Sequence, residues 1–188
     1  MIATDRLIIR PWRDSDRAAF AAMGRDPQVM RFLGPLQSRE ECDQAIDRMM
    51  AMQTALGMCF WAVERRDDAA FIGFCGLKPG PVDTPLADGI EIGWRLAQVY
   101  WGQGYAREAA QASLDWGWTN LDCSAISAIT VMANSASWGL MERLGMQRVP
   151  DGDFDHPSLP EGHPLRRHIL YTIARPQKSR GKPIATRS

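Results

Sequence analysis

The chain has 188 residues, and its 22 Lys and Arg balance 22 Asp and Glu, so the formal net charge is zero. A neutral chain has no general electrostatic attraction to nucleic acid or to an anionic membrane, and we expect neither as a partner. The length suits one domain with a substantial hydrophobic core.

The composition is that of an ordinary globular protein, with 45% hydrophobic and 23% charged residues. No apolar run approaches the length of a membrane-spanning helix, and the N-terminus lacks the basic start and apolar stretch of a signal peptide. The four cysteines, Cys42, Cys59, Cys75 and Cys123, are scattered without a C-x-x-C pair. We therefore expect reduced, mostly buried thiols in a cytoplasmic protein, with no metal site and no disulfide.

The first elements are a strand and a helix. Apolar alternation predicts a strand over residues 7–11, and Asp14 is a candidate cap for a helix over 17–23. Asp-Pro and Gly-Pro pairs then break the chain on either side of 29–33.

A second helix begins at Ser38, because Glu41 three residues later completes a capping box. Its apolar stripe comprises Cys42, Ala45, Ile46, Met49, Met50 and Gln53. Strands over 59–63 and 71–77 follow, and the polar turn between them predicts a hairpin.

The second half alternates strands with helices. After a loop over 79–89, the pattern predicts a strand over 90–96, a helix over 104–119, a strand over 125–131, a helix over 136–144, a short strand over 147–149 and a last strand over 168–174. Hairpin strands followed by helix-separated strands indicate a mixed α/β sheet. We expect one domain over 1–174 and a basic, disordered tail over 175–188, which carries five Lys or Arg and no acid.

The strand over 90–96 leads into a short glycine turn and then an alanine-rich helix. Gly102 and Gly104 suit a backbone that curls close to a ligand, and the first N–H groups of a helix are unpaired and favour an anion. The turn lacks the Lys-Ser/Thr of a P-loop, and Arg107 replaces the third small residue of a dinucleotide fingerprint. A phosphate site is one interpretation, and a plain tight turn is the other.

Three segments in order resemble one enzyme family. They are Thr-Asp-Arg-Leu-Ile-Ile-Arg-Pro-Trp at 4–12, Tyr-Trp-Gly-Gln-Gly-Tyr-Ala-Arg-Glu-Ala at 100–109, and an Asn-x-x-Ser…Leu-Gly-Met ending at 134–146. They resemble the GNAT N-acetyltransferases, and Trp101, where Arg or Gln is usual, resembles the RimJ/RimL-like branch. The resemblance runs from about residue 4 to about residue 174.

The resemblance implies a single GNAT-type α/β domain with a mixed, mostly antiparallel central sheet flanked by helices. It implies acetyl transfer from acetyl-CoA to a primary amine, on a protein N-terminus or a small molecule, by direct attack in a ternary complex. The residues it assigns to acetyl-CoA are Trp94, Leu96, Trp101, Gly102, Gln103, Gly104, Tyr105, Ala106, Arg107 and Asn134. In this family an extended pantetheine arm pairs with the backbone at Trp94 and Leu96, and Asn134 bonds a pantetheine amide. The alternative for Asn134 is a helix cap, and both roles are compatible.

Two residues are candidates for the chemistry. Glu91, on an otherwise apolar strand, matches the glutamate to which the family assigns the general base; the alternative is a solvent-facing strand residue. Ser137 is the candidate proton donor to the CoA thiolate, because the tyrosine that many family members use there is Met141 in this chain. A water molecule is the other candidate donor.

The three histidines, His156, His163 and His168, follow no metal-binding spacing. His156 and His163 lie in a long loop, where we expect contact with substrate, as we do for Phe32; either histidine is also an alternative base.

Acidic residues decide what we expect of the acceptor. If Asp83, Asp88, Glu91 and the acids of 151–155 converge, they form an acidic cleft rim that favours a cationic amine.

A rival from another class is a GNAT fold that holds CoA without turnover, as a sensor or interaction module. The sequence leaves a homodimer open.

Overall fold

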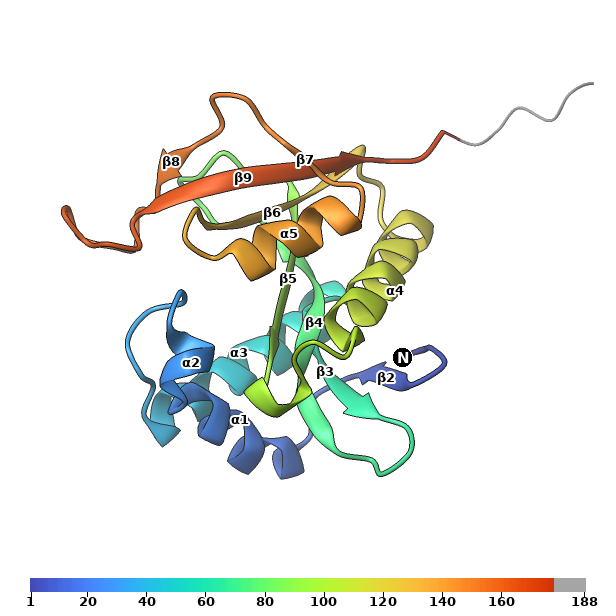
Figure 1. Ribbon diagram of the computed structural model, residues 1–188. Helices are drawn as coiled ribbons and strands as arrows, with labels where there is room; N and C mark the ends of the chain where they lie inside the picture. Colours follow the sequence, from blue (N-terminus) through green and yellow to red (C-terminus); the bar gives the residue numbers. More distant parts are fainter. Residues whose placement is uncertain (178–188) are drawn as a thin grey trace, which may run out of the picture.

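The fold is a nine-stranded mixed sheet with helices on both faces, seen in a computed structural model that describes residues 1–177 (Figure 1). The strand order is β1-β2-β3-β4-β5-β6-β9-β7, and β8 pairs with β9. Every pairing is antiparallel except that of β5 with β6. The predicted mixed, mostly antiparallel α/β sheet is therefore confirmed.

The strands are β1 (Ile2–Ala3), β2 (Leu7–Arg10), β3 (Phe60–Arg65), β4 (Phe71–Pro79), β5 (Ile90–Leu96), β6 (Ala125–Val131), β7 (Gln147–Arg148), β8 (Phe154–Asp155) and β9 (Arg167–Ala174). The helices are α1 (Arg17–Gly24), α2 (Pro27–Met30), α3 (Arg39–Leu56), α4 (Tyr105–Asn120) and α5 (Ser135–Arg143), with 3₁₀ turns η1 (Asp14–Asp16) and η2 (Gln98–Tyr100).

Most predicted elements lie within a residue or two of these bounds, and the capping box of Ser38 and Glu41 is confirmed. The cap predicted at Asp14 is wrong. Asp14 lies inside η1, and the carboxylate of Asp16 instead accepts the backbone N–H of Arg13 at 2.8 Å. The sequence also gives no signal for β1 and β8, because two-residue strands show no periodicity and exist only through distant partners.

The stripe predicted for α3 needs one correction. Cys42 and Ile46 are fully buried, and Met49 packs against the core. Met50 is 39% exposed, and Met52 packs on the core instead. A helix turns by about 100° per residue, so the adjacent Met49 and Met50 cannot share one face.

Different helices cover the two faces of the sheet. On one face an aromatic cluster of Trp12, Phe20, Phe60 and Phe74 packs between the strands and α1. On the other face α4 lies so close at Gly117 that an added Cβ would meet Leu77 Cδ1 at 2.6 Å. A small residue here lets α4 approach β4 directly.

The sheet opens between β5 and β6. Their parallel pairing covers only Ile90 with Ile126 and Glu91 with Ser127, whereas β5 stays paired with β4 through Leu96. Figure 1 shows β5 running downward, away from β6 and β9, which cross the upper part of the molecule. The edge of β5 beyond Glu91 therefore has no strand beside it and is free to pair with an extended ligand.

At the C-terminal end Arg175 contacts the domain. Its guanidinium donates to the carbonyl of Trp118 in the last turn of α4 at 2.6 Å and to that of Cys123 after the helix at 2.9 Å. The rest of the predicted basic tail, residues 178–188, lies outside the described residues.

Candidate active site

The glycine turn between β5 and α4 has the backbone that the sequence predicts. Gly102 has φ +72° and Gly104 has φ +83°, the left-handed region where other residues are strained. Gly104 occupies the N-cap position of α4, and its carbonyl accepts the N–H of Glu108 at 3.1 Å. The earlier N–H groups of the helix are thus available to an anion.

Side chains hold this turn in place. The indole N–H of Trp101 donates to the carbonyl of Leu96 at 2.8 Å, which ties the turn to the end of β5. Arg6 donates to the carbonyl of Gln103 at 3.0 Å and forms an ion pair with Glu108 at 2.6 Å. Arg6 is missed by sequence reasoning because it lies almost a hundred residues from the turn, at the start of the chain.

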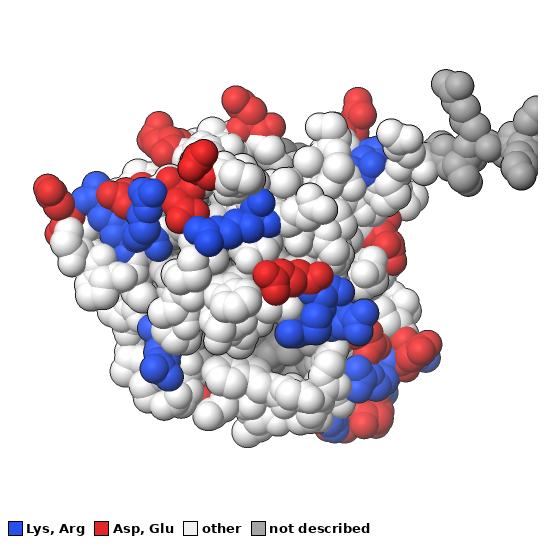
Figure 2. Space-filling view, turned by 45° about the horizontal axis from the view of Figure 1, so that its top comes forward, with Lys and Arg blue, Asp and Glu red and all other residues white. Residues whose placement is uncertain are grey.

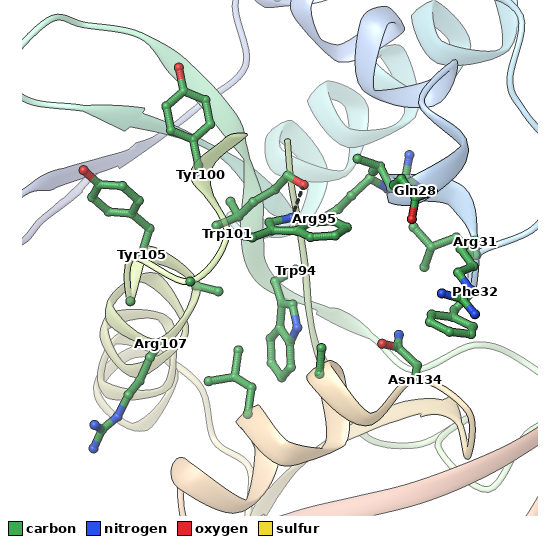
Figure 3. Close-up of a pocket in the computed structure, with 18 of the residues that line it drawn as sticks. Gln28, Arg31, Phe32, Trp94, Arg95, Tyr100, Trp101, Tyr105, Arg107 and Asn134 are labelled. Atoms are coloured by element: carbon green, nitrogen blue, oxygen red, sulfur yellow. Dashed lines mark hydrogen bonds between the residues drawn. The ribbon is translucent and has the colours of Figure 1, made fainter. Parts of the chain in front are cut away.

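A cavity of about 530 Å³ opens beside the turn. It lies between α2 and the loop after it, the end of β5, the start of α4, and α5 (Figure 3). Figure 3 shows Trp94 in the middle, with Tyr105 and Arg107 on the α4 side and Gln28, Arg31 and Phe32 on the opposite side. The space-filling view shows a hollow with basic side chains at one side and an acidic group next to them (Figure 2).

Ten of the predicted site residues line this cavity. They are Phe32, Trp94, Leu96, Trp101, Gly102, Gly104, Tyr105, Ala106, Arg107 and Asn134. The cavity brings these residues together from the α2 loop, β5, α4 and the start of α5. The predicted residues that do not line it are Gln103, Glu91, Ser137, His156 and His163.

Sequence reasoning missed nine lining residues. They are Gln28, Val29, Arg31, Leu33, Arg95, Tyr100, Ala136, Leu140 and Arg143. The last three follow helical spacing on α5, so projecting that helix from Asn134 would have found them. Those around α2 carry no local signal, because only the folding of α1 and α2 over the sheet brings them to β5.

The charge of the cavity differs from the expected acidic rim. Its charged lining residues are Arg31, Arg95, Arg107 and Arg143, and no Asp or Glu in the described chain lines it. In the loop over residues 151–165, called the late loop below, Asp153 pairs with Arg148 at 2.7 Å and Asp155 with Arg167 at 3.4 Å. The condition for an acidic rim, convergence of these acids, is not met at this cavity, which is basic.

Glu91 is buried, so the alternative that it faces solvent is wrong. Its carboxylate accepts a hydrogen bond from the ammonium group of Lys78, which lies opposite on β4. Burial raises the pKa of Glu91, while the charges of Lys78 and His168 oppose that shift. The carboxylate sits where β5 and β6 part, and its raised pKa suits a general base.

The two candidates on α5 differ in their surroundings. Asn134 lies at the N-cap position but does not cap the helix; its amide donates to Thr130 Oγ1 at 3.1 Å. The predicted cap is thus wrong, and Asn134 lines the cavity. Ser137 is half-buried and stands one helical turn before Met141, which is 1% exposed in the core. Any tyrosine at position 141 would have to enter that core.

The histidines separate into two places. The ring of His156 packs at a tilt against that of His168 of β9, with centroids 5.0 Å apart, and Phe154 packs on both. Burial lowers the pKa of His156, and the nearby charges of His168 and Lys78 add to that effect. His156 thus lies on the Glu91 side of the opening, whereas His163 stays in its own loop turn, accepting from the N–H of Leu165 at 3.1 Å.

The thiols give no support to an acyl-enzyme. Cys42, Cys59 and Cys75 are buried, as expected, and Cys123 is half-buried. Burial raises the pKa of both Cys59 and Cys75 to about 12, so both stay protonated near neutral pH.

No helix within residues 1–177 is long and apolar enough to cross a membrane. That same region has no group of three or more His, Cys, Asp or Glu arranged to hold a metal ion.

Comparison with known families agrees with this geometry. Residues 6–147 match the family model described as an acetyltransferase (GNAT) domain. The chain belongs to the GNAT acetyltransferase family. Within that family, it is 30% identical over 146 residues to the uncharacterized protein YkkB of Bacillus subtilis (strain 168), covering 77% of this chain and 84% of YkkB.

Two further likenesses concern named acetyltransferases. This GNAT chain is 28% identical to the FsC-acetyl coenzyme A-N(2)-transacetylase of Aspergillus fumigatus, over 98% of this chain and 81% of that one. It superimposes with a TM-score of 0.76 on the crystal structure of a GNAT-family acetyltransferase from Bacillus anthracis, at 25% identity, over 93% and 98% of the two chains. The predicted GNAT membership and acyltransferase class are thereby confirmed.

The RimJ/RimL-like branch has weaker support. The structure of RimL, the ribosomal L7/L12 alpha-N-protein acetyltransferase, in complex with CoA shares a TM-score of 0.72 with this GNAT domain. The two chains are 15% identical, over 91% of this chain and 95% of RimL. At that identity the likeness shows a shared fold, and the branch stays a prediction.

Proposed function

We propose that this GNAT domain transfers an acetyl group from acetyl-CoA to a primary amine by direct attack in a ternary complex. The observation that carries the proposal is one cavity shared by two binding features. The unbonded N–H groups at the start of α4 and the unpaired edge of β5 both border it. A diphosphate with an extended arm suits the first and then the second.

The donor side of the cavity is the α4 and α5 side. The α4 N-terminus and Arg107 suit the phosphates, and Arg143 adds a second positive charge from α5. Trp94 and Asn134 lie further in, where the arm would run along β5. The Leu96 carbonyl already accepts from Trp101, so we assign the arm's backbone pairing mainly to Trp94.

Glu91 is our candidate base. When the amine nitrogen bonds to the acetyl carbon, it must lose a proton, and the Glu91 carboxylate takes it directly or through a water. Its burial beside Lys78 keeps it fixed, and its raised pKa brings it closer to the pKa of an amine. Because Glu91 does not line the cavity itself, a bridging water is the form we favour.

The leaving sulfur requires a proton as its bond to the acetyl carbon breaks. Ser137 is our candidate donor, and its hydroxyl makes no hydrogen bond to another described residue. A serine hydroxyl is a weak acid, so its role is to pass on a proton from water and be replenished by solvent. The buried Met141 cannot serve.

The acceptor enters from the opposite side, bordered by α2 and the late loop. Phe32 lines that side of the cavity, and we place His156 and His163 in the loop above it. RimL is a ribosomal L7/L12 alpha-N-protein acetyltransferase, and the Aspergillus fumigatus relative is the FsC-acetyl coenzyme A-N(2)-transacetylase. We retain both classes of acceptor, a protein N-terminus and a small amine, and keep the RimJ/RimL-like branch as a proposal.

The test is release of free CoA thiol from acetyl-CoA in the presence of a panel of primary amines. Amine-dependent release together with mass-spectrometric detection of the acetylated amine supports the proposal. Tight CoA binding without release for any amine would instead support the non-catalytic CoA-binding module. Calorimetry of CoA binding is therefore run on the same protein.

A further inference from the structure

Arg95 is a half-buried cation whose charge is not matched within residues 1–177. Its Nε is buried and has no hydrogen-bond partner. Two other buried side-chain atoms in residues 1–177 share that state, Asp43 Oδ1 and Arg166 Nε. Both of those have an oppositely charged side chain 3.6 Å away, whereas Arg95 forms no ion pair within the described chain. An orphaned donor of this kind is costly and calls for an explanation.

The groups around Arg95 do not supply the missing negative charge. Its guanidinium lies over the rings of Phe20 and Phe74, at 5.5 and 5.3 Å, and Nη1 donates to the neutral amide of Gln37 at 3.0 Å. Burial lowers the pKa of Arg95 to about 10, so the side chain remains charged at neutral pH. Aromatic faces and one amide oxygen hold the cation but do not neutralise it.

The position of Arg95 within the cavity also bears on its role. It lines the cavity together with Arg31, an exposed arginine of the α2 loop that has no ion pair within residues 1–177. In Figure 3 both lie apart from Arg107, which marks the donor side. Of the four arginines that line the cavity, Arg95 and Arg31 are therefore on the side that we assign to the acceptor.

The strand geometry relates Arg95 to the proposed base. Glu91 and Arg95 are four residues apart on β5, so their side chains leave the same face of the sheet. At the rise of a strand their Cα atoms are about 13 Å apart. An amine next to Glu91 therefore needs a chain of several bonds to bring another group to Arg95.

We infer that the acceptor is an amino carboxylate, whose carboxylate pairs with Arg95 while its amine lies near Glu91. This inference rests on the proposed function and names its substrate class. The carboxylate neutralises the guanidinium from the cavity side, and Arg31 adds a second, solvent-side contact. The separation along β5 favours ω-amino acids over α-amino acids, and the basic cavity disfavours polyamines.

The experiment compares ω-amino acids of increasing chain length with their primary amides and with the matching diamines. The amide keeps the shape and the amine but removes the negative charge. We expect kcat/KM for the carboxylate to exceed that for the amide by about tenfold to a hundredfold, the value of a hydrogen bond to a charged group. We expect R95Q to bring this ratio close to one and R95K to retain part of it.

The ratio separates a binding role from a structural one. A purely structural Arg95 would lower both rates together and leave the ratio unchanged, which would overturn the inference. Loss of CoA affinity in a folded R95Q variant would also overturn it, because the arginine would then belong to the donor. R48Q, which removes an exposed arginine from α3, is the matched control and should leave the ratio as in the wild type.

Binding to the CoA-loaded protein, measured by calorimetry, distinguishes this inference from the proposed function. Arg95-dependent binding of the amino carboxylate without transfer would support the inference and contradict the function. Transfer to amines with no preference for the carboxylate would support the function and overturn the inference.

Discussion

Lys78 and Glu91 face each other across β4 and β5 and form an ion pair whose side chains are 19% and 12% exposed. The pair lies at the last parallel contact of β5 with β6, where the sheet opens. Burial raises the pKa of Glu91 and the ammonium group lowers it, and burial is the larger effect. Lys78 therefore offsets part of the cost of burying a carboxylate at the opening.

Replacing Glu91 with Gln should leave the fold and CoA affinity intact and reduce acetyl transfer by about 10²- to 10⁴-fold, the usual contribution of a general base. The base works as a carboxylate, so wild-type activity should fall as pH drops through the raised pKa of Glu91, above the ordinary glutamate value. A pH profile of kcat/KM measures both effects. E40Q, an exposed glutamate of α3, is the control.

The ion pair of Glu91 with Lys78 predicts the direction in which the pH profile should move when Lys78 is replaced. Removing the ammonium group in K78M leaves burial unopposed by Lys78, so the acid limb of the profile should move to higher pH. If E91Q keeps wild-type transfer and profile, Glu91 is not the base, and His156, His163 or water must take the proton.

Replacing Gly104 with Val should weaken CoA binding strongly, because the side chain would enter the turn at the start of α4. Backbone strain contributes too, since the φ of Gly104 is +83°. An added Cβ would also lie 3.4 Å from Arg6 Nη2. G57V separates the two effects: Gly57 has φ +72°, no atom within 4 Å of an added Cβ, and lies at the end of α3. Calorimetry should show loss of CoA affinity in the first variant alone, and equal affinities would contradict the assignment of the turn.

The late loop should affect the acceptor and not the donor. Residues 157–163 lie beyond β8, so a Gly/Ser segment of equal length leaves the β8–β9 pairing and the Asp153–Arg148 ion pair in place. We expect an unchanged dissociation constant for CoA and a higher Michaelis constant for the amine, or no transfer at all. Weaker CoA binding by a folded variant would assign the loop to the donor site.

A buried charge network should dominate stability near α1. Arg10 makes two hydrogen bonds to Asp16, both at 2.8 Å, and a third to Glu64 at 2.7 Å. D16A leaves the buried Arg10 without its main partner and should lower the free energy of unfolding by about 3–5 kcal/mol. D14A, two residues away with its side chain 87% exposed, should cost less than about 1 kcal/mol. Urea denaturation measures both, and similar losses would refute a special role for the buried pair.

Elements with local signals could be predicted from the sequence alone. The bounds of β5 and β6 were predicted as observed, because their apolar runs end at turn residues. The Ser38–Glu41 capping box and the positive φ of Gly102 and Gly104 also depend on neighbouring residues alone. The family resemblance names nine of the cavity's lining residues in advance, and Phe32, expected at the acceptor, is the tenth.

The pairing of charges depends on the folded chain. Lys78 is paired with Glu91 by strand register, and Arg6 reaches the turn from the start of the chain. Arg95 and Arg31 share a cavity because α1 and α2 fold over β5, and Asp153 and Asp155 are held by arginines elsewhere. Charge pairing acts between side chains within a few ångströms in space, whatever their separation in sequence. The sequence therefore left the charge of the cavity open, and the unmatched charge of Arg95 could not be foreseen.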